Sequence, residues 1–302
     1  HISNSTMFRE RQMYVSIRDA SIIDAGYSSI KEGLEALGLS VIEADFSREP
    51  DLVAIDDNNK RFSVATDADI DIYAAHLKEH GVKISALLLA NDLNAEDLDA
   101  EHAWMKQACR VAFRLGALAV RIDSAMTGQQ ELPFEERVGK FVTGIKRIIA
   151  ETPDTPVDLG IENHGYQGND PEFLHGVFGG VGSDRIGMTL DTGNFYWRGH
   201  PMTKTLAVID EFAKLAKHTH VKNINYPEDK RDMEREMGWE YGKYVSPIYE
   251  GDIDHSKVIA SLKKAGYDRD LCIEDESLGK FTEAERKVIL KKDAEHLLAL
   301  VG

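Results

Sequence analysis

Apolar residues follow two periods along the chain, one typical of strands and one typical of helices. Short apolar runs of strand type recur eight times, and each is followed by a longer stretch with a helical period of about 3.6 residues. The strand-type runs are 14–20, 41–46, 84–91, 117–124, 157–165, 186–194, 218–223 and 271–277. The helix-type stretches are 28–38, 65–81, 100–116, 134–151, 171–182, 202–216, 254–266 and 284–301. Several of these helices reach a glycine, which suits a left-handed helix cap.

Regular alternation of strands and helices predicts a parallel sheet, and eight units in 302 residues predict an α/β protein with a single (β/α)8 TIM barrel. A doubly wound open sheet is the alternative, but no glycine-rich phosphate loop follows the first strand. We expect the barrel to span residues 7–302, because residues 1–6 precede a methionine and look like a remnant of an expression vector.

One connection, residues 225–252, is too long for an ordinary loop between a strand and the next helix. In a barrel, a loop after a strand lies on the catalytic face. The segment is charged and contains interspersed aromatic residues, among them Trp239, Tyr241 and Tyr244. We expect it to be a lid over substrate, with an oligomer contact or an ornamental loop as the alternatives.

Charge and composition limit the partners of the protein. The formal net charge is -16 and the basic residues are scattered, so we expect no nucleic-acid partner. No run is long and apolar enough for a membrane span, so we expect no membrane partner. Cys109 and Cys272 lack metal-type spacing and suit a reducing compartment such as the cytoplasm. A small carbohydrate-like molecule is the expected partner, and a homo-oligomer is left open.

Alternation within the last four strands places polar side chains inside the barrel at the carboxyl ends of the strands. These inward positions are Glu162, Asp191, His218, His220, Lys222 and Glu274. Carboxylates and an imidazole suit one divalent metal ion, Mn²⁺, Mg²⁺, Co²⁺ or Fe²⁺, and the lack of thiolates disfavours Zn²⁺. Without a cation the acids would repel one another or stay partly protonated.

Four segments carry a family resemblance: VDLGIENHG, IGMTLDTGN, HTHVKN and GDIDHSKVIASLKKAGYDRDLCIEDE. In order and spacing they resemble the sugar phosphate isomerase/epimerase family of xylose isomerase-like TIM barrels. The resemblance implies that Glu162, Asp191, His220 and Glu274 bind a single metal ion, and that Glu162 and Glu274 transfer protons. Relatives often carry histidine where this chain has Asn194, which implies a changed substrate contact. Relatives that act as abasic-site endonucleases need extra histidines, so Asn194 argues against that role.

Other polar residues near these strand ends are expected to contact substrate, and each has a structural alternative. The expected substrate-binding residues are His164, Asn194, His218, Lys222 and Trp239. His164 could equally be a hydrogen-bonded rim residue, and His218 a metal ligand or a hydrogen-bonded barrel residue. A nearby cation would lower the pKa of Lys222, whose alternative is an ion pair with a loop carboxylate such as Glu228.

Three charged residues in the earlier strands share the inward parity, namely Arg18, Glu43 and Arg121. We interpret them as a structural charge network in the floor of the barrel. Trp239 has core packing as its alternative role, although its place in a loop favours stacking on a sugar.

The residues and the resemblance together predict a metal-dependent isomerase or epimerase of a sugar, keto-sugar or polyol derivative. Glu162 and Glu274 would move a proton through a metal-bound enediolate. A dehydratase or lyase acting on a keto-sugar, cyclitol or 3-keto-glycoside is the alternative, with His164 or His218 as the acid. A non-catalytic barrel that binds a ligand is a more distant alternative for the function. The sequence carries no strong phosphate site, so we expect a non-phosphorylated substrate.

Overall fold

The computed structural model describes residues 12–302, so the prediction for residues 1–6 lies outside the described part of the chain. Eight parallel strands form one sheet in the order β12-β1-β2-β5-β6-β7-β8-β9. The bounds are β1 (Tyr14–Arg18), β2 (Val41–Asp45), β5 (Lys83–Leu88), β6 (Ala119–Ile122), β7 (Asp158–Glu162), β8 (Ile186–Asp191), β9 (Ala216–His220) and β12 (Asp270–Ile273). The sheet closes where Val221 bridges Ile273 in parallel, and the Glu274 N–H donates to the Val221 carbonyl at 3.0 Å. The predicted TIM barrel is therefore confirmed.

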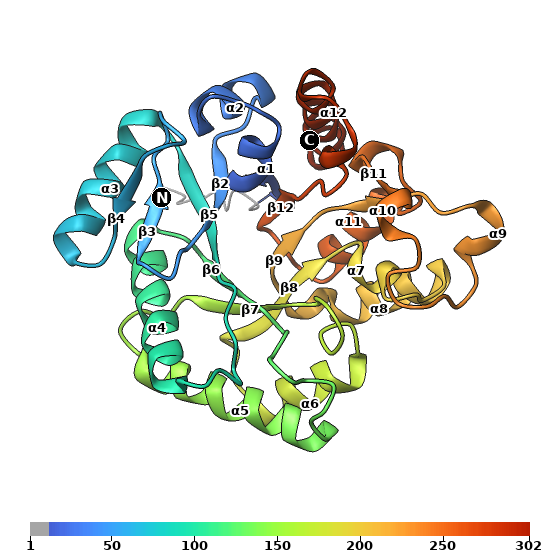
Figure 1. The fold of residues 1–302 in the computed structure, drawn as a ribbon, viewed down its shortest axis with the longest axis horizontal. Coiled ribbons are helices and arrows are strands. Elements are labelled where there is room, and N and C mark those ends of the chain that lie inside the picture. The colour runs from blue at the N-terminus through green and yellow to red at the C-terminus, as the bar shows by residue number, and fades with distance from the viewer. Residues whose placement is uncertain (1–11) are drawn as a thin grey trace, which may run out of the picture.

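The main helices surround these strands, as Figure 1 shows. They are α2 (Ile30–Leu37), α3 (Asp67–His80), α4 (Leu98–Leu115), α5 (Phe134–Glu151), α6 (Pro171–Val181), α8 (Met202–Phe212), α11 (His255–Lys264) and α12 (Glu283–Val301). Helices α2, α3 and α4 end at Gly38, Gly81 and Gly116, all in the left-handed conformation that the sequence predicted. The predicted helix 202–216 is too long, because a 3-10 turn at Ala213–Leu215 leads directly into β9.

Several short elements were not predicted. They are α1 (Asp19–Asp24), the hairpin β3 (Asp51–Val53) and β4 (Arg61–Ser63), and α7 (Asn194–Trp197). The long connection also contains structure, namely α9 (Glu228–Arg231), α10 (Tyr241–Tyr244), β11 (Val245–Ser246) and a 3-10 turn at Ile248–Glu250. β11 pairs antiparallel with β10 (Asn223–Ile224), the short strand that follows β9. These pieces are too short to show a helical or strand period in the sequence.

The 225–252 loop is fastened to the segment that follows β8, and the two lie together at the right of Figure 1. The guanidinium of Arg235 lies over the rings of both Tyr196 and Tyr226, at 4.5 and 4.4 Å from their centroids. The Arg235 N–H donates to the Gly199 carbonyl at 2.9 Å. Gly199 has a φ of +107°, and a Cβ there would lie 2.1 Å from the Arg235 carbonyl oxygen. The loop is thus fastened to the segment after β8, and only glycine at position 199 allows this close approach.

Packing between sheet and helices fixes which side chains face the barrel interior. Leu159, Ile161, Met188 and Leu190 are almost completely buried in the hydrophobic core. Burying each such side chain stabilises the fold by about 1.5–3 kcal/mol, so the register of β7 and β8 is firmly set. The residues between them therefore point inward. Within residues 12–302, no helix is both long and apolar enough to cross a membrane.

Candidate metal centre

Four titratable side chains meet at the carboxyl ends of neighbouring strands. Glu162 ends β7, Asp191 ends β8, His220 ends β9, and Glu274 directly follows β12. One ligand atom from each lies within 4.8 Å of those from the other three, and all four residues are buried. The structure therefore brings together the four residues that the sequence predicted as metal ligands.

Three polar atoms in this cluster have no hydrogen-bond partner, although all are buried. They are Asp191 Oδ2, His220 Nδ1 and Glu274 Oε2. Charged neighbours are close, since Lys222 Nζ lies 3.1 Å from Asp191 Oδ2 and 3.0 Å from Glu274 Oε2, and His220 Nδ1 lies 3.1 Å from Glu274 Oε2. None of these contacts has the geometry of a hydrogen bond, so the three atoms are compensated in charge but are not aligned with a donor. A divalent cation accepts lone pairs from carboxylate oxygen and imidazole nitrogen, so the residues present fit such an ion.

Glu43 orients His220 toward the cluster. His220 Nε2 lies 2.8 and 3.0 Å from the two Glu43 carboxylate oxygens, so it donates and leaves Nδ1 facing Glu162 and Glu274. A metal-binding histidine usually donates its other ring N–H to a carboxylate in this way. Burial would lower the pKa of His220, but Glu274, Glu43 and Glu162 raise it well above its usual range, so without a metal ion Nδ1 carries a proton that faces Glu162 and Glu274 at 3.4 and 3.1 Å. A metal ion at this position would replace that proton.

A second possible ligand group lies directly below, formed by Glu43, His218, His220 and Cys272. His218 Nδ1 lies 3.0 Å from Asp270, and His218 Nε2 lies 2.8 Å from Glu43. Both nitrogens of His218 are thus occupied by hydrogen bonds. Burial raises the pKa of the Cys272 thiol to about 12, so it remains a protonated, poor ligand. The upper cluster is the better candidate, because three of its four residues present a buried atom without an aligned hydrogen bond.

The contacts of His218 correct its prediction as a substrate-binding residue. Its side chain is fully buried beneath the upper cluster, with carboxylates on both sides. It is therefore a hydrogen-bonded barrel residue, the alternative considered for it. Arg18, Glu43 and Arg121 do form buried charge contacts, with Arg18 Nε 3.6 Å from Glu43 Oε2, and this network continues into the cluster. Each of the three contacts one residue of the cluster, respectively Glu274, His220 and Glu162.

Neighbouring cationic side chains, among them two arginines, keep the glutamates of the cluster ionised. Arg121 Nε donates to Glu162 Oε2 at 2.6 Å, and Arg18 donates to Glu274 Oε1. Burial alone would raise the pKa of Glu162, but Arg121 and His220 hold it well below its usual range. Burial would likewise raise the pKa of Glu274, whereas His220, Lys222 and Arg18 lower it.

Asp191 has no arginine partner. Burial, together with the negative charges of Glu162 and Glu274, raises its pKa to about 7 despite the nearby Lys222. Without a metal ion, Asp191 is therefore the carboxyl group of the cluster that holds a proton most readily.

The four residues Asp191, Thr192, Gly193 and Asn194 each have a role at the rim. The Asp191 Oδ1 atom accepts the N–H groups of Gly193 and Asn194 at 2.8 and 2.7 Å, which leaves Oδ2 facing the cluster. Thr192 Oγ1 donates to the Lys222 carbonyl at 2.9 Å. The amide of Asn194 donates to Glu162 Oε1 at 3.0 Å. Asn194 therefore holds both Asp191 and Glu162 in place. The sequence did not indicate these two hydrogen bonds.

Lys222 lies beside the cluster with its ammonium group among three carboxylates. The Nζ atom is 3.1 Å from Asp191 Oδ2, 3.0 Å from Glu274 Oε2 and 2.7 Å from Glu276 Oε1. Burial would lower the pKa of Lys222, but these carboxylates raise it well above its usual range. Its loop partner is thus Glu276, not Glu228.

His164 and Trp239 occupy different environments. His164 Nδ1 lies 3.0 Å from Asp123 Oδ1, and the side chain is 48% exposed at the rim. The hydrogen bond with Asp123 raises the pKa of His164. Trp239 stacks on Tyr244 and packs against Tyr226, so its contacts match the packing alternative.

Tyr241 is the aromatic residue of the 225–252 loop that reaches the site. Its hydroxyl donates to Glu276 Oε2, on the other side of that carboxylate from Lys222. The sequence placed Tyr241 in the right loop, but neither Glu276 nor Asp123 was recognised as a partner of the site. Both contacts cross from one strand end or loop to another, which periodicity along the chain does not report.

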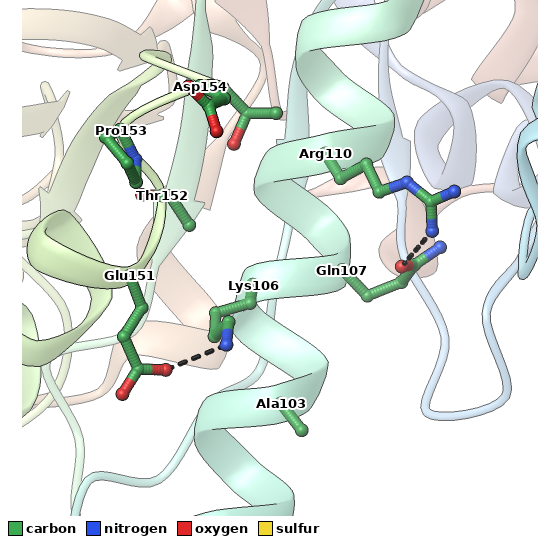
Figure 2. Close-up of a pocket in the computed structure, with 9 residues that line it drawn as sticks. Ala103, Lys106, Gln107, Arg110, Glu151, Thr152, Pro153 and Asp154 are labelled. Atoms are coloured by element: carbon green, nitrogen blue, oxygen red, sulfur yellow. Dashed lines mark hydrogen bonds and ion pairs between the residues drawn. The ribbon is translucent and has the colours of Figure 1, made fainter.

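Two surface grooves lie outside the cluster. One, of about 380 Å³, is lined by residues including Asp45, Arg48, Arg61 and Trp104, and Asp45 is bonded to Arg18 at 3.0 Å. It therefore adjoins the candidate site through the arginine that holds Glu274. The other, of about 370 Å³, lies between α4 and the loop after α5, with Lys106 paired to Glu151 at 2.8 Å (Figure 2). That loop precedes β7, so this groove is at the opposite end of the barrel from Glu162.

Comparisons with known proteins agree with this architecture. Residues 32–300 match the family model described as xylose isomerase-like TIM barrel. No curated protein sequence matches the chain significantly. The IOLI protein with a bound zinc atom superposes with a TM-score of 0.70 at 19% identity, over 96% of this chain and 99% of that one.

Two further structures are similar at low identity. An L-ribulose 3-epimerase has a TM-score of 0.66 and 17% identity, covering 95% of this chain and 94% of its own. The probable 3-DHS dehydratase AsbF of Bacillus anthracis has a TM-score of 0.66 and 15% identity, covering 95% and 99%. At such low identities the superpositions show only the fold. The match to the family model shows the family, because it spans most of the sequence. The chain therefore belongs to the xylose isomerase-like TIM barrel family.

Proposed function

We propose that the protein is a divalent-metal-dependent isomerase or epimerase of a sugar, keto-sugar or polyol derivative. The observation that carries this proposal is the set of buried, unpartnered ligand atoms on Asp191, His220 and Glu274 beside Glu162. Among the similar folds, one protein is named as an L-ribulose 3-epimerase, which is the same class of reaction. Mn²⁺, Mg²⁺, Co²⁺ and Fe²⁺ suit the carboxylate-rich ligand set, and the zinc of the IOLI structure adds Zn²⁺ to the metals to be tested.

Glu162 and Glu274 are the proposed proton-transfer pair. Neighbouring cationic side chains keep both carboxylates ionised, chiefly Arg121 for Glu162 and His220 for Glu274, so each can accept a proton from carbon but is a weak base. A bound divalent cation would polarise the substrate carbonyl and an adjacent hydroxyl, which acidifies the neighbouring C–H bond. Glu162 would remove the proton, and Glu274 would return it to the opposite face or to the adjacent carbon. The reverse assignment of the two glutamates is chemically equivalent.

Substitution of each glutamate tests this assignment. In D2O, the wild-type protein should incorporate deuterium into a reactive keto-sugar, while Glu162→Gln and Glu274→Gln should lose exchange, since an amide does not accept a carbon-bound proton. Exposed Glu172 in α6 provides a control, and Glu172→Gln should exchange at the wild-type rate. Full exchange in both cluster variants would exclude the two-glutamate mechanism. A wild-type protein that binds no divalent metal would instead favour the non-catalytic ligand-binding barrel.

A dehydratase or lyase is the second candidate, favoured by the geometry of His164. His164 is half exposed and held by Asp123 at 3.0 Å, so it could protonate a departing hydroxyl group at the rim. The probable dehydratase AsbF shares the fold. Elimination of water reduces the mass of the product by that of one water molecule, whereas isomerisation does not change it. Mass spectrometry of products from keto-sugars, cyclitols and 3-keto-glycosides therefore separates the two reactions.

Other predicted substrate contacts belong to the same proposal. Asn194 and Lys222 lie at the rim of the cluster and would hydrogen-bond substrate hydroxyl groups from there. The 225–252 loop would cover the bound substrate and contribute Tyr241 rather than Trp239 to the wall of the site.

A further inference from the structure

Lys222 contacts the same oxygen atoms that the metal ion would require. Its ammonium nitrogen is 3.1 Å from Asp191 Oδ2 and 3.0 Å from Glu274 Oε2. Neither oxygen has a hydrogen-bond partner of good geometry, so the ammonium group is near them without being aligned to either. The ammonium group of Lys222 therefore compensates the negative charge of the cluster carboxylates without a specific hydrogen bond to them.

The path of the lysine side chain is fixed by the residues around it. The Thr192 hydroxyl donates to the Lys222 carbonyl, and the Lys222 N–H donates to the same hydroxyl at 3.1 Å. A Cβ at Gly193 would lie 2.5 Å from Lys222 Cγ, so glycine lets the lysine stem pass directly over the chain next to Asp191. The backbone and stem are therefore held, and the ammonium end is the part that can move.

A second carboxylate lies within reach of that ammonium group. Lys222 Nζ donates to Glu276 Oε1 at 2.7 Å, and the Tyr241 hydroxyl donates to the other oxygen of the same carboxylate. The side chain of Glu276 is 40% exposed, whereas those of Asp191 and Glu274 are buried. Glu276 therefore offers Lys222 a partner outside the cluster, oriented by the 225–252 loop.

We propose that Lys222 is a built-in competitor of the metal ion, and that Glu276, which already binds its ammonium group, holds that group away from the cluster when the ion binds. This inference rests on the proposed metal centre and adds to it a positioning role for two residues. A divalent cation and an ammonium group at contact distance from the same two oxygens repel each other strongly in a buried site. The lysine thus compensates the acids in the metal-free protein and lowers the affinity for the ion. With the ion bound, the ammonium group of Lys222 lies at the rim beside Tyr241.

Titration calorimetry with Mn²⁺ tests the competition. Lys222→Gln should bind Mn²⁺ about 10-fold more tightly than the wild type or better, because a like charge at contact distance has been removed. Glu276→Gln should bind Mn²⁺ several-fold more weakly, since Lys222 then has only the cluster carboxylates as partners. In the double variant, which lacks Lys222 as well, adding Glu276→Gln should change the Mn²⁺ affinity by less than about threefold. Such a result would show that Glu276 acts on the metal ion through Lys222.

Lys217 provides a matched control at the other end of β9, where it lies 3.6 Å from Asp158. Lys217→Gln should leave the Mn²⁺ affinity unchanged. An affinity of Lys222→Gln equal to or below that of the wild type would overturn the competition. If Lys222→Gln does not fold, an unchanged affinity in the half-exposed Glu276→Gln variant would overturn it equally. Wild-type binding that survives Asp191→Asn, or no binding in any variant, would refute the metal centre itself.

Discussion

Glu43→Gln is the substitution that most directly examines how the barrel floor supports the metal centre. Glu43 is fully buried and accepts hydrogen bonds from His218 and His220, both at 2.8 Å. A glutamine amide has the same shape but only one acceptor oxygen. In the variant, the NH2 group must therefore face the ring nitrogen of His218 or His220, each of which donates to Glu43 in the wild-type protein.

The cost can be worked out from these two contacts. A hydrogen bond to a charged group contributes about 1.5–3 kcal/mol and a neutral one about 0.5–1.5 kcal/mol, so weakening one bond and losing the other costs about 2–5 kcal/mol. For a chain of this size, about 2 °C per kcal/mol gives a fall in Tm of about 4–10 °C. Because His220 is no longer firmly oriented, the Mn²⁺ affinity should also fall by about 10- to 100-fold.

Scanning calorimetry and Mn²⁺ titration measure the two effects separately. Asp270→Asn is the matched comparison, because Asp270 holds His218 at 3.0 Å and does not contact His220. It should lower the Tm while changing the Mn²⁺ affinity by less than about threefold, since it acts one residue further from the cluster. A Glu43→Gln protein with wild-type Tm and wild-type Mn²⁺ affinity would refute the assignment of Glu43 as the residue that orients His220.

Three further predictions concern the cluster, the rim and the surrounding packing. Removing metal with EDTA should lower the Tm and adding Mn²⁺ should restore it, with no such response in Asp191→Asn, because the ion stabilises only the folded state that binds it. Gly193→Ala should destabilise the protein by about 1–3 kcal/mol through its 2.5 Å approach to Lys222 Cγ, whereas Gly279→Ala, with open space around it, should be neutral by thermal melting. Burial and then Asp275 raise the pKa of Asp293 well above its usual range, so the fold favours the protonated acid and loses that stability as pH rises. Asp293→Asn should therefore raise the Tm at pH 8 and have little effect at pH 5, and equal gains at both pH values would contradict this linkage.

Much of the fold follows from local sequence because its elements are long and regular. The eight strand–helix units were correct, since the strands pack apolar residues against the helices and most of the helices are amphipathic. The hairpin at 51–63 and the short helix at 194–197 were not predicted. Their segments bury side chains such as Leu52 and Phe195 in the common core, which depends on neighbours distant in sequence.

Strand parity predicted which side chains point into the barrel, and the family resemblance selected the four candidate ligands among them. Glu162, Asp191 and His220 end adjacent parallel strands, and parallel pairing puts such residues at one end of the barrel. The partners of these residues were harder to foresee. Glu43 reaches His220 from the far side of the barrel interior, and Glu276 meets Lys222 only because the sheet closes between β9 and β12. Such contacts depend on closure of the barrel, which no local pattern encodes.

The fastening of the 225–252 loop bears on how enzymes of this architecture can be recombined. Arg235 joins the loop to Tyr196 and Gly199, and the helix that contains Tyr196 begins three residues after Asp191. Transplanting the loop alone from a relative would leave those partners unmatched and would strain the chain next to the metal centre. The smallest exchangeable cassette is therefore two separate segments, 194–200 and 225–252. A library that shuffles both together should yield far more folded proteins than one that varies the loop by itself.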